Sequence, residues 1–160
     1  MQVENGEAKF QALVDCNISS MLAVTRAVLP SMVARGRGAV INMSSYSAHC
    51  GPLLAVYAAS KAFVIQFSSD LEMEYREKGV TIMCAAPYYV VSNMSKIRRA
   101  SLTTPTATVY AASVLGQLGT TAFTYGYWAH DLVAFAIRWE HMKSGETNGS
   151  IFSSYKSETF

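Results

Sequence analysis

The sequence predicts an α/β protein in which helices cover a parallel sheet, and three segments indicate this. Residues 39–44 (AVINMS) and 80–86 (VTIMCAA) are short, apolar and rich in β-branched side chains, as buried parallel strands are. Between them, residues 57–78 carry apolar side chains at helical spacing. Because a strand, a helix and a strand in this order form one βαβ unit, we expect the two strands to be parallel.

The segment before the first strand predicts a second long helix. Over residues 10–34, apolar side chains recur at spacings of three and four. Pro30 lies late in this segment, so we expect a kink or an early end there, with Arg35–Gly38 (RGRG) closing the helix. Residues 1–9 are polar and are expected to be loose.

Two more helices are expected after the second strand. Thr104 is the expected N-cap and Pro105 the first helical residue of one of them. An aromatic-rich stretch predicts the other, from about Trp128. We therefore expect one domain over residues 10–142, followed by a flexible tail over residues 143–160 that is rich in Gly and Ser.

Composition excludes several classes of protein. Hydrophobic residues make up 51% of the 160 residues and charged residues 15%, which is too apolar for a disordered chain. A net charge of +2 gives no field that argues for nucleic acid, and the densest basic patch, Lys96–Arg99, favours an ordinary solvated surface. The three cysteines and three histidines show no metal-ligand spacing, so no metal is expected. We find no uninterrupted apolar run of about 18 residues, so we expect no ordinary membrane span.

Tyr57 and Lys61, in the stretch YAASK, predict an acid–base site. Residues four apart share one face of a helix, so the phenol and the ammonium are neighbours. A nearby ammonium favours the phenolate and prepares a tyrosine to exchange a proton near neutral pH. Ser44 and Ser45 follow the first strand, at the strand end where α/β sheets bind ligands.

A family resemblance gives this pattern a wider meaning. The stretch NISSMLAVTRAVLPSMVARGRGAVINMSSYSAHCGPLLAVYAASKAFVIQFSSDLEMEY resembles the catalytic half of the short-chain dehydrogenase/reductases. PYYV, MSK and GYWAH further on resemble the group of 17β-hydroxysteroid dehydrogenases type 3/12 and very-long-chain 3-ketoacyl-CoA reductases. The resemblance implies part of a Rossmann-like, doubly wound parallel sheet and an NADP(H) cofactor. It also implies a place on the endoplasmic reticulum membrane, with the cytoplasm as the alternative.

The resemblance also implies roles for individual residues. Tyr57 corresponds to the acid/base, and Lys61 to its partner, which also holds the nicotinamide ribose. Asn17 corresponds to a helix asparagine that holds a water in the proton relay, with a buried polar helix residue as the alternative. Ser45 corresponds to the substrate-orienting serine by its place in NMSS, whereas the family's usual spacing to the tyrosine favours Ser44. The segment beside the nicotinamide corresponds to Pro87, Val90 and Ser92.

The cofactor site of the family includes a Gly-rich turn, TGxxxGxG, that follows a strand, and this sequence contains none. Gly36–Gly38 comes before a strand and cannot replace it. We therefore expect a partial sheet without the N-terminal dinucleotide-binding half, with an exposed apolar edge at residues 39–44. The resemblance further implies a homodimer through the helices of residues 10–34 and 57–78.

Three functions remain open at this stage. The first is NADPH-dependent reduction of a ketone, either a 3-ketoacyl-CoA in fatty acid elongation or a 17-ketosteroid, with this chain inactive on its own. The second is a non-catalytic fragment that pairs through its long helices. The third is a membrane-surface module built on residues 125–142, for which a docked C-terminal helix is the alternative explanation.

Overall fold

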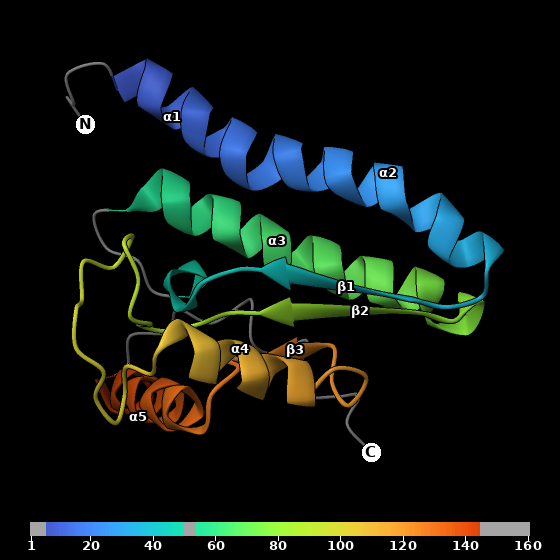
Figure 1. Cartoon of the computed structure of the whole chain (residues 1–160). Helices are drawn as coiled ribbons and strands as arrows, with labels where there is room; N and C mark the ends of the chain where they lie inside the picture. Colours follow the sequence, from blue (N-terminus) through green and yellow to red (C-terminus); the bar gives the residue numbers. More distant parts are fainter. Residues whose placement is uncertain (1–5, 50–53, 145–160) are drawn as a thin grey trace.

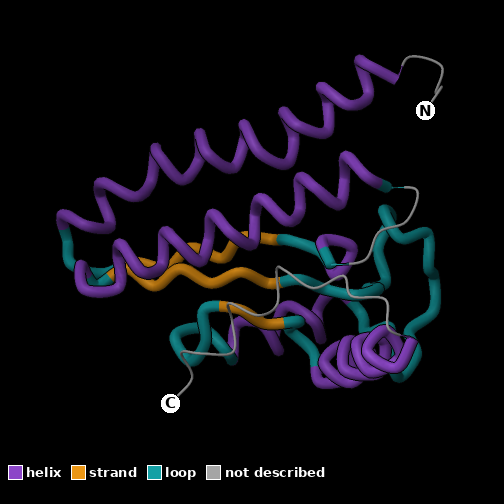
Figure 2. The backbone as a smooth tube through the Cα atoms, turned by 180° about the vertical axis from the view of Figure 1, so that it is seen from behind, coloured by secondary structure: helices purple, strands orange, loops and turns teal. Residues whose placement is uncertain are grey.

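The protein is a layered α/β structure, shown as a computed structural model in Figure 1, and residues 6–49 and 54–144 are described. One layer holds α1 (Gly6–Val14), α2 (Ser20–Ala34) and α3 (Ala55–Tyr75). The sheet consists of β1 (Gly38–Met43), β2 (Val80–Ala85) and β3 (Phe123–Thr124). On the other side of the sheet lies α4 (Ala107–Gly116), and α5 (Trp128–Ser144) lies near the carboxyl ends of β1 and β2 (Figures 1 and 2).

The sheet confirms the predicted βαβ unit. Its order is β1-β2-β3, and both strand pairs are parallel. Val40 lies opposite Ile82, and Asn42 lies opposite Cys84. Within the described residues β1 has a strand on one side only, so the predicted exposed edge is present. Strand β3 was not predicted, because two residues are too few to show a strand period.

The first helix differs from its prediction at its start. It begins at Gly6 and not at residue 10, so Gly6–Lys9 are helical. Of the two outcomes expected at Pro30, a kink or an early end, the early end does not occur, since α2 continues to Ala34, the predicted last residue. Proline removes one amide donor only, and the last turn is held by the bond from Arg35 N to Ser31 O. Gly36, with a φ of 64°, then ends the helix as expected of the RGRG segment.

By average hydropathy, one helix among the described residues is long and apolar enough to span a membrane: Glu7–Ala34. This differs from our expectation, which counted uninterrupted apolar runs, because an average tolerates scattered polar residues. Its inner side packs on the protein: Leu29 is buried in a cluster with Leu71, Val80 and Ile82. Covering the sheet therefore accounts for part of its apolar character.

The face that α3 buries is partly polar. The buried side chains of α3 are Ser60, Val64, Ile65, Ser68 and Leu71. Serine is small enough to let a helix approach a sheet closely. The hydroxyls are satisfied inside the helix, since Ser68 donates to Val64 O at 2.6 Å and Ser60 donates to Tyr57 O at 2.7 Å.

The start of α4 lies two residues after its prediction. Thr106 is the N-cap, and its hydroxyl accepts a bond from Val109 N. Thr104 is buried instead in a short bridge with Ser101. Pro105 O accepts from Val91 N at 3.0 Å, so this residue ties the preceding loop to the segment after β2.

Candidate active site

Tyr57 and Lys61 lie together on the first turns of α3, beside the carboxyl ends of β1 and β2 (Figure 1). The ammonium Nζ of Lys61 lies 5.8 Å from the centroid of the Tyr57 ring. The same nitrogen donates to Met43 O, the last carbonyl of β1, at 3.0 Å. The structure thus brings together the pair that the YAASK spacing predicts, and the bond to Met43 fixes its position relative to the sheet.

The Lys61 ammonium lies in surroundings that penalise its positive charge. Its pKa is lowered, mainly because burial penalises the charged form, while the Cys16 and Cys84 thiols act in the opposite direction. Burial raises the pKa of Cys84 to about 12, so that thiol stays neutral near pH 7. A charge that is costly to bury interacts strongly with a phenolate nearby. Such an ammonium is suited to stabilise the tyrosinate that proton donation leaves behind.

The two serines after β1 have different surroundings. Ser44 is buried; its Oγ donates to Lys61 O at 2.7 Å and its amide donates to Ala85 O. Ser45 is only half-buried, and its Oγ accepts a bond from Ser47 N at 3.2 Å. That bond leaves the Ser45 hydroxyl hydrogen available to donate. The geometry therefore favours Ser45 as the serine that meets a substrate and gives Ser44 a supporting position.

We predict opposite consequences for the two serines. Ser44→Ala should lower the free energy of unfolding by about 1 kcal/mol, because a buried hydrogen bond is lost. Ser45→Ala should change the stability by less than about 0.5 kcal/mol, since it removes a half-exposed group. Urea unfolding followed by circular dichroism measures both values. The assignment is wrong if Ser45→Ala is the more destabilising of the two.

Asn17 lies in a π-helical turn, Asp15–Ser19, between α1 and α2. Its Nδ2 donates to Ser60 Oγ at 3.0 Å, and Ser60 Oγ donates to Tyr57 O at 2.7 Å. The side chain thus connects the first helix to the turn of α3 that carries Tyr57. A π-turn frequently marks a functional position in a helix. The role of Asn17 in a proton relay stays a prediction, and its bond to Ser60 is an additional, structural role.

The segment predicted to lie beside a nicotinamide follows β2. Pro87 O accepts from Tyr46 N at 2.9 Å, and Tyr46 is the residue after Ser45. Val90 O accepts from Ser95 Oγ at 2.7 Å, and Ser92 Oγ accepts from Ser95 N at 3.1 Å. The structure therefore places Pro87 next to the serine segment. Sequence reasoning missed Ser95, although the spacing of two serines three apart is typical of a side-chain-stabilised turn.

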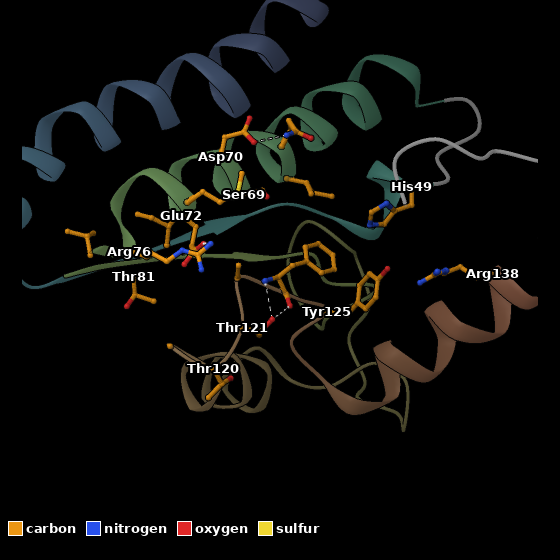
Figure 3. Close-up of a pocket in the computed structure, with 18 residues that line it drawn as sticks. His49, Ser69, Asp70, Glu72, Arg76, Thr81, Thr120, Thr121, Tyr125 and Arg138 are labelled. Atoms are coloured by element: carbon orange, nitrogen blue, oxygen red, sulfur yellow. Dashed lines mark hydrogen bonds and ion pairs between the residues drawn. The ribbon is translucent and has the colours of Figure 1, made fainter. Parts of the chain in front are cut away.

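A separate cleft of about 870 Å³ lies between α3, β3 and α5 (Figure 3). Arg76 and Thr81 line one end of it, and His49 and Arg138 line the other. Its walls include none of the predicted catalytic residues. The sequence did not predict this cleft, because its walls come from segments far apart in the chain.

A parallel sheet covered by helices, with a tyrosine–lysine pair at the carboxyl end of β1, defines the class of the protein as an α/β fold of the doubly wound kind. The family model described as short chain dehydrogenase matches residues 2–103. The chain belongs to the short-chain dehydrogenase family.

Within this family the chain is similar to the very-long-chain 3-oxoacyl-CoA reductases. It is 38% identical to the Bos taurus protein of that name over 135 residues, which cover 84% of this chain and 43% of the relative. Identity to the Rattus norvegicus protein is 34% over 149 residues, covering 90% and 48%. This chain therefore spans less than half the length of these relatives.

Solved structures confirm the fold. A short chain dehydrogenase from Burkholderia cenocepacia, in complex with NADP, superposes with a TM-score of 0.73 at 21% identity, covering 86% of this chain and 59% of that one. A gluconate 5-dehydrogenase from the same organism, in complex with NADP and tartrate, gives a TM-score of 0.54 at 28% identity, covering 56% and 35%. The predicted partial Rossmann-like parallel sheet is therefore correct.

Proposed function

We propose that this chain provides the catalytic corner of a reductase that converts the ketone of a 3-oxoacyl-CoA to an alcohol, with NADPH as the reductant. The observation that carries the proposal is the Tyr57–Lys61 pair, held against β1 by the bond to Met43 O, two residues before Ser45. The similarity to very-long-chain 3-oxoacyl-CoA reductases supports a 3-oxoacyl-CoA over a 17-ketosteroid.

Each residue of the corner has a chemical task in this reaction. Ser45 donates a hydrogen bond to the ketone oxygen and orients it. Tyr57 donates its hydroxyl proton to that oxygen as negative charge develops there. Lys61 stabilises the resulting phenolate through its positive charge. When bound, a reduced nicotinamide would supply the hydride.

The residues present fit one end of that cofactor. The Lys61 ammonium has three N–H donors, and its bond to Met43 O occupies one, so the group has the donors that ribose hydroxyls require. Pro87 and Ser92 lie on the segment that follows the neighbouring strand. The sequence has no TGxxxGxG turn for the pyrophosphate. We therefore propose that these residues reduce a ketone only together with a dinucleotide-binding half.

A reductase assay tests the proposal. NADPH consumption is followed at 340 nm with a 3-oxoacyl-CoA or a 17-ketosteroid, for the 160 residues alone and for the same residues joined to the first half of the bovine relative. We expect turnover only in the joined protein and only with the acyl-CoA. If the joined protein reduces the steroid and not the acyl-CoA, the proposed substrate is wrong. If the 160 residues reduce a ketone without the added half, their proposed dependence on that half is wrong.

A non-catalytic role in pairing is the alternative, and one observation favours it. Apolar side chains are exposed on the outer layer, among them Val24 of α2 and Phe63 of α3, which are 62% and 38% exposed. A second copy packed on this layer would cover them. Sedimentation equilibrium of the wild type and of Val24→Ser measures the oligomeric state. A wild-type dimer that the substitution converts to a monomer supports pairing, and a wild-type monomer refutes it.

A second candidate is attachment to an anionic membrane surface, in keeping with the endoplasmic reticulum expectation. The exposed side of α5 carries Trp128, Leu132, Phe135 and Trp139, which are 46–64% exposed. The rings of Phe135 and Trp139 stack with centroids 6.3 Å apart, and the Lys143 ammonium lies 5.4 Å from the Trp139 ring. Exposed aromatic side chains with a neighbouring lysine suit an interface with anionic lipid.

Vesicle flotation tests this attachment. The wild-type chain should float with vesicles that contain phosphatidylserine, and the double variant Phe135→Ser, Trp139→Ser should lose most of this binding because the buried apolar area is removed. Leu115→Ser is the matched control, since Leu115 is 60% exposed on α4. If the double variant and the control float equally well, α5 is not the attachment surface.

A further inference from the structure

His130 is a buried polar residue of α5 that the catalytic corner does not use directly. Its side chain is 0% exposed. The ring nitrogen Nε2 lies 3.1 Å from Tyr89 O. The other nitrogen, Nδ1, lies 3.4 Å from Tyr88 N and 3.3 Å from Tyr125 O. The imidazole thus contacts the backbone of two consecutive residues that follow β2.

The surroundings of the ring select one tautomer. Nε2 faces a carbonyl oxygen, so it must carry a hydrogen to form a bond there. Nδ1 faces the amide of Tyr88, so it can accept from that donor when it carries no hydrogen. The remaining neighbour, Tyr125 O, is already satisfied by the Tyr110 hydroxyl at 3.2 Å. An imidazole that carries its hydrogen on Nε2 therefore pairs with both Tyr89 O and Tyr88 N.

These two bonds act on the segment that adjoins the catalytic corner. Tyr88 and Tyr89 lie between Pro87 and Val90, the positions predicted to lie beside a nicotinamide. Pro87 O in turn accepts from Tyr46 N, next to Ser45. The helix carrying His130 lies beside the chain that leaves β2 (Figures 1 and 2). A side chain of α5 is thereby linked through the backbone to both the cofactor segment and the serine segment.

Ring contacts reinforce this link. The His130 ring lies 5.6 Å from the Tyr110 ring and 5.5 Å from the Tyr127 ring, measured between centroids. Tyr88 and Tyr46 pack edge to face at 5.5 Å. Because these rings surround the imidazole, it cannot change its orientation without disturbing its neighbours, and the two backbone bonds keep a fixed direction.

We propose that His130 is a positioning residue that holds the Pro87–Val90 segment in place for the cofactor, as a neutral imidazole protonated on Nε2. The purpose of this arrangement rests on the proposed reductase function. The two bonds from His130 to the backbone of Tyr88 and Tyr89, called the clamp below, do not rest on it. The family model matches residues 2–103 and does not extend to α5. The proposal therefore gives α5 a task in the site.

Nuclear magnetic resonance of the ¹⁵N-labelled chain tests the tautomer. We expect the His130 ring to show a protonated Nε2 and an unprotonated Nδ1 at pH 7. A ring protonated on Nδ1, alone or together with Nε2, would overturn the proposal, because Nδ1 could then accept nothing from Tyr88.

Amide exchange of variants tests the clamp. His130→Leu should speed hydrogen exchange at Tyr88 N about tenfold or more, while Ser44 N and Ala86 N, which bond to β2 and β3 partners, keep their wild-type rates. His130→Gln should restore part of the protection, since an amide can both donate and accept. Leu132→Ala, an exposed change on the same helix, is the control. Unchanged exchange at Tyr88, or an equal increase at all three amides, would overturn the clamp.

Kinetics of the joined reductase test the purpose. His130→Leu should raise KM for NADPH about tenfold and leave KM for the acyl-CoA within about twofold. Unchanged NADPH kinetics with faster exchange at Tyr88 would reduce His130 to a structural residue and refute its positioning role. If the wild-type joined protein reduces no ketone, the reductase proposal fails, whereas the tautomer and the exchange rates still decide the clamp.

Discussion

Tyr57→Phe is expected to lower kcat for ketone reduction by about 10³-fold in the protein that carries both halves of the domain. The substitution removes only the phenolic oxygen, so the ring keeps its place above Lys61. Without that hydroxyl no side chain at the corner donates a proton to the alkoxide that develops on the ketone oxygen. The rate of NADPH consumption with a saturating 3-oxoacyl-CoA measures the effect.

Tyr75→Phe is the matched control for this prediction. Tyr75 ends the same helix, and Lys78 lies over its ring at 4.1 Å, so it forms a second tyrosine–lysine pair away from the carboxyl ends of the strands. We expect wild-type turnover from Tyr75→Phe and an unchanged melting temperature from Tyr57→Phe. Turnover of Tyr57→Phe within about tenfold of wild type would show that the proton comes from another group.

The comparison of the two pairs shows why a tyrosine–lysine contact alone could not identify the site. A tyrosine and a lysine close together on a helix occur twice in α3 and the turn that follows it. The pair at Tyr57 and Lys61 contacts the carboxyl end of a strand, through Met43 O. The pair at Tyr75 and Lys78 lies at the opposite end of the sheet, just before β2 begins. The sequence could indicate this pair because a short apolar strand and two serines precede it. The functional prediction thus depended on the arrangement of neighbouring elements.

What the sequence could not predict depends on contacts between distant segments. The difference between Ser44 and Ser45 becomes visible only when Lys61 O is placed 2.7 Å from the Ser44 hydroxyl. Likewise, His130 looked like an ordinary residue of an aromatic helix until Tyr88 and Tyr89 were found next to its ring. Hydrophobic periodicity predicts which face of a helix is buried, but it does not predict which polar groups of other segments lie against that face.

The second large effect is expected for stability, at Gly79. This residue ends the short helical turn Arg76–Lys78 and leads into β2 with a φ of 75°, a left-handed conformation that is costly for residues with a Cβ. A Cβ added there would also collide with the carbonyl oxygen of Gly36. We expect Gly79→Ala to lower the free energy of unfolding by about 3–5 kcal/mol, measured by urea denaturation.

Gly36→Ala separates the two causes of that loss. Gly36 also has a positive φ, of 64°, but a Cβ there would meet no atom within 4 Å. We therefore expect Gly36→Ala to cost only about 1–2 kcal/mol, the cost of the backbone conformation alone. The difference between the two variants reports the close contact between the turn after α2 and the turn after α3. If both variants lose the same stability, the two turns can move apart to accept the added methyl group, and the close approach at Gly79 is not rigid.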